Sequence, residues 1–245
     1  MNKQIRDFIK NHAEKTFPNE CCGVVSVNFL GDVKCFESEN LSLNKESRFL
    51  IDNKVLIDAY KFGHVVCFYH SHASTFKDDK LNKFSKEDID CSEESCIPAY
   101  LYVVNHNTWH YHRPKGYKHQ NLMSRPFIWG IWDCYRSVVD YLREKNIIIG
   151  NYFPEDEIDL KKEIGFEKGL EKEPSLIEIG VSEMKPNDIL FFKINSNYIN
   201  HCAVYIGDNK YFHHQLGKYA CEREFEEKMF NKLYKVYRYN DKSKT

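Results

Sequence analysis

The pattern of apolar and polar positions predicts alternating helices and strands in the first half of the chain. Residues 2–15 place Ile5, Phe8 and Ile9 on one face of a helix, between charged positions. The apolar run at 22–27 is typical of a buried strand. By the same patterns we expect further strands at 34–37, 65–69, 99–104 and 108–112, and further helices at 54–62 and 85–91.

A polar segment that contains Pro114 and Gly116 follows this region and has the composition of a domain boundary. After it, the pattern predicts a helix at 134–145 and strands at 188–192, 201–207 and 210–214. We therefore expect an α+β chain with two domains, 1–114 and 125–245, joined by a linker at 115–124.

Charge and cysteine content narrow the classes of function. The 35 basic and 36 acidic residues nearly cancel, so no overall positive field favours nucleic acid as a partner. No stretch of about 18 apolar residues is present, and we expect no membrane span. The nine cysteines form no CxxC pair, a pattern that favours synthesis in a reducing cytoplasm.

A candidate metal site lies in the first half. His70 and His72 follow a predicted strand, and alternation along an extended chain puts both imidazoles on one side. Asp88 lies in the first turn of a helix that Ser85 is expected to cap. Two imidazoles, one carboxylate and a water are the ligands of an open, catalytic zinc site. Glu20, just before the first strand, could then act as the general base.

A single HxH pair is a weak signal, but the ordered set of segments over about residues 1–112 resembles the JAMM metallopeptidases. The resemblance implies an α/β sandwich of the JAMM/MPN type, which is cytidine-deaminase-like. It implies a Zn²⁺ ion held by His70, His72 and Asp88, with Glu20 as base and Ser85 stabilising the oxyanion. The sequence departs from that family at Ala73, where Pro is usual, and in a longer segment between His72 and Ser85. The segments that carry the resemblance are 18–25, 48–52, 70–72, 85–88 and 97–100.

A candidate thiol site lies in the second half. Cys134 falls at the predicted start of a helix, where the helix dipole stabilises a thiolate. His201 begins one predicted strand and His213 ends the next, so a hairpin would bring the two rings close together. His201 could then serve as the base and His213 could orient it, with His214 as a rival for that role. The alternative is a buried structural thiol with two unrelated histidines.

The context of these residues resembles the NlpC-type papain-like peptidases over about residues 121–238. That resemblance implies a papain-like α+β domain that cleaves the stem peptides of bacterial peptidoglycan. Cys134 would be the nucleophile, His201 the base and His213 the third member. Phe127 stands where Tyr is common in the family, Tyr135 where Ser is usual, and Asn187 where Gly is common. The segments that carry the resemblance are 127–135, 185–192 and 201–213.

The order of the two domains resembles the tail-tip assembly peptidases of lambda-like phages. The resemblance implies a bifunctional hydrolase, made in the host cytoplasm, that acts in tail assembly or cell-wall penetration. Its expected partners are phage tail-tip proteins and peptidoglycan stem peptides, and its place is the virion tail tip or a transient assembly complex. Two alternatives remain open. One is a cellular or defence-associated deubiquitinase-like isopeptidase fused to a cell-wall hydrolase, and the other is a non-catalytic tail assembly module.

Overall fold

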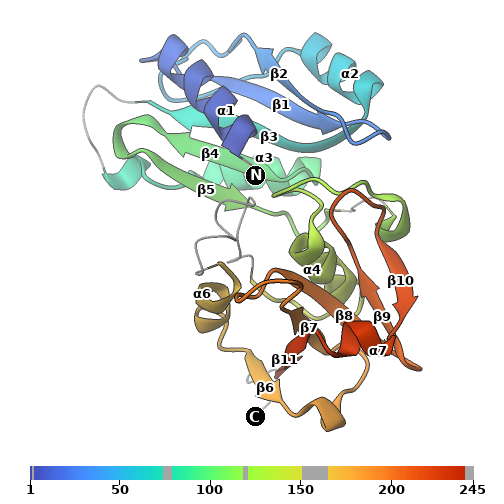
Figure 1. Cartoon of the computed structure of the whole chain (residues 1–245). Helices are drawn as coiled ribbons and strands as arrows, with labels where there is room; N and C mark the ends of the chain where they lie inside the picture. Colours follow the sequence, from blue (N-terminus) through green and yellow to red (C-terminus); the bar gives the residue numbers. More distant parts are fainter. Residues whose placement is uncertain (2, 74–78, 118–120, 151–164, 241–245) are drawn as a thin grey trace. The chain divides into compact units, whose positions relative to one another are not determined.

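Two separate β-sheets form the framework of the chain (Figure 1). The computed structural model describes residues 1, 3–73, 79–117, 121–150 and 165–240. The first sheet belongs to a unit that spans Lys3–Lys118, and the second to a unit that spans His119–Thr245. Each unit combines its sheet with helices, so the α+β class expected from the sequence is confirmed.

The sheet of the first unit has five strands in the order β2-β1-β3-β4-β5. Strand β1 is antiparallel to β2 and β3, β3 is parallel to β4, and β4 is antiparallel to β5. The two central strands, β1 and β3, are buried along nearly their whole length, as their continuous apolar runs predict. The bounds of the strands are β1 Cys22–Val27, β2 Val33–Ser38, β3 His64–His72, β4 Ala99–Val103 and β5 Thr108–His112.

Helices cover both faces of this sheet. Helix α1 (Lys3–Thr16) buries Ile5, Ile9 and Ala13, and its His12 ring meets the hydroxyl of Tyr69 on β3 at 3.0 Å. On the opposite face, Ala59 of α2 (Asn53–Phe62) packs with Val24 of β1 and Val65 of β3. The third helix, α3 (Lys86–Ser95), packs against β4.

Gly23 of β1 leaves room for the Tyr69 side chain of β3. The Tyr69 ring lies directly over Gly23, and a Cβ at this position would collide with that ring and with the carbonyl of Phe36. Only glycine therefore fits there. The resulting register pairs Cys22 with His70, so the chain enters β1 beside the end of β3.

The sheet of the second unit has six strands in the order β10-β9-β8-β7-β11-β6, and all neighbouring pairs are antiparallel. The sequence pattern predicted β7, β8 and β9 but not the outer strands. The bounds are β6 Leu176–Ile179, β7 Ile189–Phe192, β8 His201–Gly207, β9 Lys210–His213, β10 Cys221–Glu224 and β11 Leu233–Tyr239.

The two faces of this second sheet bury different clusters. Helix α4 (Cys134–Glu144) packs Val138 and Leu142 against Cys202 and Val204 of β8. The opposite face carries a separate cluster that includes Phe192, Ala203 and Tyr211. The remaining described elements are η1 Asp79–Leu81, η2 Val104–His106, η3 Leu122–Ser124, α6 Gly165–Glu171, η4 Val181–Glu183 and α7 Glu227–Phe230. None of the described helices has the length and hydropathy that a membrane crossing requires.

Candidate active sites

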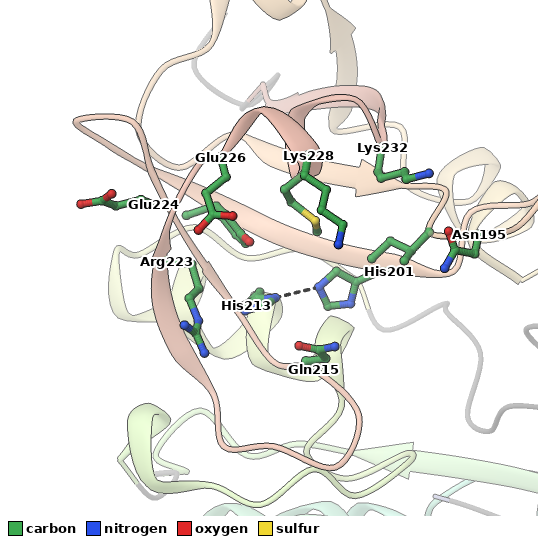
Figure 2. A pocket seen from close by; sticks show the side chains of 12 residues that line it. Asn195, His201, His213, Gln215, Arg223, Glu224, Glu226, Lys228 and Lys232 are labelled. Carbon is green, nitrogen blue, oxygen red and sulfur yellow. Dashed lines mark hydrogen bonds between the residues drawn. The ribbon is translucent and has the colours of Figure 1, made fainter.

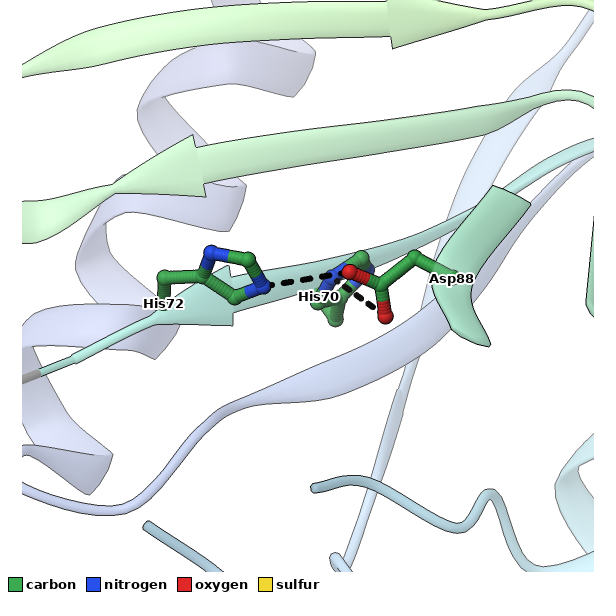
Figure 3. A group of neighbouring side chains, drawn as sticks. All are labelled: His70, His72 and Asp88. Atoms are coloured by element: carbon green, nitrogen blue, oxygen red, sulfur yellow. Dashed lines mark hydrogen bonds and ion pairs between the residues drawn. The ribbon is translucent and has the colours of Figure 1, made fainter. Parts of the chain in front are cut away.

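His70, His72 and Asp88 form a compact group at the end of β3 (Figure 3). The strand runs through both histidines, three residues beyond the range predicted from its apolar run. Asp88 reaches them from α3, with Oδ1 at 3.3 Å from His70 Nε2 and Oδ2 at 3.2 Å from His72 Nε2. One ligand atom from each residue lies within 4.8 Å of the others, close enough to share one metal ion.

Local hydrogen bonds hold Asp88 and His72 in place. Ser85 caps α3 by accepting from the backbone N–H of Asp88 at 3.1 Å, while the Asp88 carboxylate accepts from the N–H of Ser85 at 2.8 Å. The expected capping pair is therefore present, and it points the carboxylate back toward β3. His72 donates from Nδ1 to the carbonyl of Leu81 at 2.9 Å, which leaves Nε2 as a lone-pair donor for a metal.

The group fits a divalent cation in its chemistry as well as its spacing. His70 is fully buried and stacks on Phe49 at 4.5 Å, yet neither of its ring nitrogens makes a well-aligned hydrogen bond among the described residues. Such an orphaned pair of buried nitrogens is costly without a ligand. Burial alone would raise the pKa of Asp88, but the close contacts of its carboxylate with the His70 and His72 rings hold it well below its usual range. The carboxylate is therefore ionised.

Glu20 lies just before β1 and is 4% exposed. Its backbone N–H donates to the carbonyl of Lys45 at 2.7 Å, and its carbonyl accepts from the Asn40 side chain at 3.1 Å. Burial, countered by His72 and reinforced by Asp88, raises the pKa of the Glu20 carboxyl to about 8. Glu20 thus interacts electrostatically with two of the three residues of the metal group, as a base beside the metal would.

A cavity of about 730 Å³ opens beside this group. Ser85 and Asp88 contribute to its lining, and Phe49, Leu50 and Leu56 supply much of its apolar wall. This volume lies in the range of small-molecule and peptide side-chain sites. A substrate in the cavity would therefore lie against the N-cap and the first turn of α3.

We expect purified protein to hold about one zinc ion per chain, as an open three-ligand site does. His72→Ala and Asp88→Ala should each weaken zinc binding by more than about 100-fold, because loss of even an outer-shell partner costs 10- to 100-fold. Elemental analysis after dialysis measures the zinc content. His110→Ala is the matched control, since His110 lies near Phe84 but outside the group. Full zinc occupancy in both ligand variants would refute the assignment.

The second site begins with Cys134, the first residue of α4. The Asp133 side chain caps this helix, accepting from the backbone N–H groups of Gly130 and Arg136, both at 2.9 Å, and from the Arg136 guanidinium at 3.0 Å. Sequence reasoning passed over Asp133, although an Asp directly before a predicted helix is the usual signal of an N-cap. These bonds fix the first turn of α4 and so the position of Cys134.

His201 and His213 lie side by side, with His201 Nε2 at 3.1 Å from His213 Nδ1 (Figure 2). The register explains the pairing. His213 is opposite Ala203, and His201 is two residues before Ala203, so both rings lie on the same face of the sheet. The structure therefore brings together the two histidines that the hairpin predicted.

Cys134 has a different neighbour. It packs in the same buried cluster as Cys202, and burial, together with the nearby Cys134 thiol, raises the pKa of Cys202 well above its ordinary value. Cys202 is adjacent to His201 in β8 and points to the α4 side, while the hydrogen bond of His201 goes to His213. Cys134 and His201 thus reach the same stretch of β8 without a hydrogen bond between them in the described residues.

His214 lies on the α4 side of the sheet. Its Nε2–H donates to the carbonyl of Lys218 at 3.2 Å, so Nδ1 accepts from the Ser137 hydroxyl at 2.9 Å. The ring also meets Phe127 edge-on at 5.2 Å. Strand alternation accounts for the difference, because adjacent residues of a strand face opposite ways. His214 therefore contacts the helix that carries Cys134, and His213 contacts His201.

These three histidines should make the second unit sensitive to acid. Burial, assisted by neighbouring positive groups, lowers the pKa of His201 to about 3 and that of His213 and His214 to about 4. In the unfolded chain the same groups return to about 6.5, so between pH 4 and 6.5 the unfolded state binds more protons. The free energy of unfolding should therefore fall as pH drops below about 6.5, by up to about 1.4 kcal/mol per pH unit for each histidine.

Urea unfolding of the Trp109→Phe variant, followed by tryptophan fluorescence at several pH values between 7.5 and 5, measures this dependence. Trp129 and Trp132 are then the tryptophans left, and both belong to the second unit. His213→Asn should reduce the slope of the unfolding free energy against pH by about the contribution of one histidine. His106→Asn in the first unit should leave this slope unchanged. A stability that stays constant over this range would contradict the neutral, buried state of the histidines.

Comparison with known proteins assigns a family to each unit. Residues 2–114 match the family described as prokaryotic homologs of the JAB domain, and residues 124–238 match the NlpC/P60 family. Over 98% of this chain and 96% of the relative, the sequence is 23% identical to tail tip assembly protein K of Escherichia phage N15.

Two solved structures are also similar. An NLP/P60-family protein of Staphylococcus aureus is 14% identical, with a TM-score of 0.34, over 55% of this chain and 52% of its own. An NlpC/P60-family protein of Bacillus cereus is 12% identical, with a TM-score of 0.34, over 95% of this chain and 67% of its own. The chain thus spans about half the length of the first and two thirds of the second.

The matched ranges agree with the two motif sets expected from the sequence, and both families indicate a hydrolase. The protein therefore carries a JAB-type domain followed by an NlpC/P60-type domain and is a homologue, along nearly its whole length, of a phage tail tip assembly protein.

Proposed function

We propose that the protein is a bifunctional peptidase of a phage tail tip, with a zinc-dependent site in 1–114, a cysteine–histidine site in 125–245 and a linker at 115–124. The observation that carries the proposal is the full-length similarity to a tail tip assembly protein. The metal-binding group of His70, His72 and Asp88 supports the first activity, and the capped Cys134 with the paired histidines supports the second.

In the first domain, His70, His72 and Asp88 would hold a zinc ion, which would supply Lewis-acid polarisation of the scissile carbonyl and of a water molecule. Glu20 takes the proton from the attacking water and passes it to the leaving amine. Ser85 accepts the Asp88 N–H through its oxygen, so its own hydroxyl proton remains available to the oxyanion. The cavity beside Ser85 holds the substrate.

In the second domain, the sulfur of Cys134 attacks the carbonyl carbon of a stem-peptide bond, and His201 accepts the thiol proton. The amine leaves with that proton, and water then hydrolyses the thioester. His213 orients the His201 ring through their hydrogen bond. The first turn of α4 supplies backbone N–H donors for the oxyanion.

Selective inhibition separates the two activities. Cys91 and Cys96 are exposed and would themselves react with iodoacetamide. The alkylation experiment therefore uses the Cys91→Ser/Cys96→Ser variant. Alkylation should stop the release of peptides from purified peptidoglycan, as measured by mass spectrometry, and a metal chelator should leave that release unchanged. Loss of stem-peptide release on chelation would refute the assignment of separate sites.

The tail role has its own test. The phage that carries the gene should lose infectious particles when the gene is deleted, and the wild-type gene supplied in trans should restore them. Electron microscopy of the lysates then shows whether tails assemble. Complementation with the Glu20→Gln gene, which lacks the first activity, and with the Cys134→Ser gene, which lacks the second, shows whether each activity is needed for tail assembly or for infection. Normal tails and normal titres without the gene would refute the tail role.

A further inference from the structure

Cys202 is a buried thiol to which the proposed mechanism gives no role. It follows His201 in β8 and belongs to the apolar cluster on the α4 side of the sheet. Cys134, the first residue of α4, belongs to the same cluster. Among the described residues, no other cysteine does, and both of these are free thiols. The two thiols therefore form a pair within one buried core.

Two independent features bring the side chains of this pair together. Strand alternation directs Cys202 to the face on which α4 packs, whereas the next residue, Ala203, belongs to the cluster on the opposite face. From the other side, the Asp133 cap fixes the first turn of α4 and so the place of Cys134. The Cys134 thiol also adds to the effect of burial in raising the pKa of Cys202, and such an influence acts at short range.

The two thiols differ in how they meet an oxidant. Cys134 is 3% exposed and is the nucleophile of the proposed mechanism, so a small oxidant can react with it. Cys202 is fully enclosed, and its raised pKa keeps it protonated at neutral pH. Because a thiolate is the form that reacts with peroxides, Cys202 is inert on its own. Cys134 is thus oxidised first, and Cys202 is in place to react with the product.

We propose that Cys134 and Cys202 are a reversible redox pair, which forms a disulfide when the protein meets hydrogen peroxide. The Cys134 sulfur attacks one peroxide oxygen, so an S–O bond forms, the O–O bond breaks, and the hydroxide that leaves combines with the Cys134 proton as water. The Cys202 sulfur then attacks the sulfenic acid at Cys134. An S–S bond forms, the S–O bond breaks, and the second hydroxide takes the Cys202 proton. Two thiols and one peroxide give one disulfide and two water molecules.

The disulfide links the activity of the second domain to the redox state of its surroundings. This consequence rests on the proposed function, because it requires Cys134 to be the nucleophile, whereas the disulfide itself does not. In a reducing compartment both thiols persist and Cys134 is available. Under oxidation Cys202 also protects Cys134, since a sulfenic acid that condenses with a neighbouring thiol is not carried on to the irreversible sulfinic acid.

Peptide mapping of the full-length protein tests the pair without any measurement of activity. The Cys91→Ser/Cys96→Ser background removes the exposed cysteines, which would otherwise link one molecule to another. After treatment with hydrogen peroxide, the remaining thiols are alkylated in denaturant, and the digest is analysed by mass spectrometry without reductant. We expect a peptide that joins Cys134 to Cys202, lighter than the two separate peptides by two hydrogen atoms. Dithiothreitol should separate it again.

Cys202→Ala removes the second thiol of the pair. In this variant Cys134 should reach the sulfinic acid, and dithiothreitol should not restore its alkylation. Cys221→Ala is the matched control, because Cys221 belongs to the same unit but lies on β10, outside the cluster. It should form the linked peptide as the parent protein does. Circular dichroism checks the fold of both variants, and the linked peptide of the parent protein decides the proposal if Cys202→Ala does not fold.

Three results would overturn the redox pair. They are the absence of a linked peptide in the parent protein, a peptide that joins Cys134 to a cysteine other than Cys202, and full recovery of the Cys134 thiol in oxidised Cys202→Ala. The release of peptides from peptidoglycan tests the proposed function separately. A linked peptide in a protein that cleaves nothing, even after reduction, would support the pair and refute the proposed activity. Undiminished release by fully linked protein would overturn the link to activity and the assignment of Cys134 as nucleophile.

Discussion

Cys134→Ser is expected to release stem peptides from peptidoglycan at least about 10³-fold more slowly than the wild type. A serine hydroxyl is far less acidic than a thiol and lacks a partner tuned to deprotonate it, and removal of a nucleophile abolishes the covalent route. The variant should fold normally, because Ser is close to Cys in volume and the Asp133 cap of α4 is retained. Mass spectrometry of released peptides measures the rate, and circular dichroism checks the fold.

Cys91→Ser is the matched control, because Cys91 is exposed and belongs to the other unit. It should keep full activity. Comparison of the histidine variants completes the test. His201→Ala should lose about as much activity as Cys134→Ser, and His213→Ala should lose less. If Cys134→Ser retained more than a tenth of wild-type turnover, Cys134 would not be the nucleophile.

Glu20→Gln should lower the peptidase activity of the first domain by about 10²- to 10⁴-fold and leave its zinc content unchanged. The substitution preserves the size and hydrogen-bonding geometry of a buried side chain but removes the proton acceptor. Glu20 lies outside the metal-binding group, which explains why zinc should stay bound. Elemental analysis and the turnover of co-expressed tail-tip proteins give the two readouts.

The conservative Glu20→Asp variant serves as the comparison. It retains a carboxylate and should recover part of the activity, whereas a purely structural role would leave Asp no better than Gln. Glu37→Gln is the control for charge, since Glu37 lines a cavity that also contains Glu20 but lies outside the metal group. Loss of zinc from Glu20→Gln would show that Glu20 is a ligand and not the base.

Local signals predicted that His70, His72 and Asp88 would lie together. The HxH spacing depends only on strand alternation, and the Ser85–Asp88 pair depends only on the first turn of a helix. Both are short-range features that one sequence contains, and the structure has both. The contacts that support them come from farther away. Leu81, which holds His72, ends the short helix η1, and Phe49, which stacks on His70, lies in an irregular segment. No periodicity in the sequence predicts the course of either segment.

The faces of β9 illustrate a limit of the sequence in the second unit. His213 and His214 are adjacent, and only the pairing with β8 decides which of them contacts α4. That pairing includes a register shift between Tyr205 and Gly207. The turn signal at Asp208–Asn209 does not predict this shift. The missed strands have a related cause. Strand β10 has the sequence Cys-Glu-Arg-Glu and is mostly exposed, so it lacks the apolar alternation that marks a strand.

The placement of the metal-binding residues has a consequence for biosynthesis. His70, His72 and Asp88 are close in sequence, and every strand of their sheet lies before residue 113. Loops this short close at little entropic cost, and contacts of low sequence separation form quickly. Domains generally fold as units while the ribosome is still at work, N-terminal first. The nascent chain can therefore bring His70, His72 and Asp88 together before translation reaches His201, on which the proposed cysteine site depends.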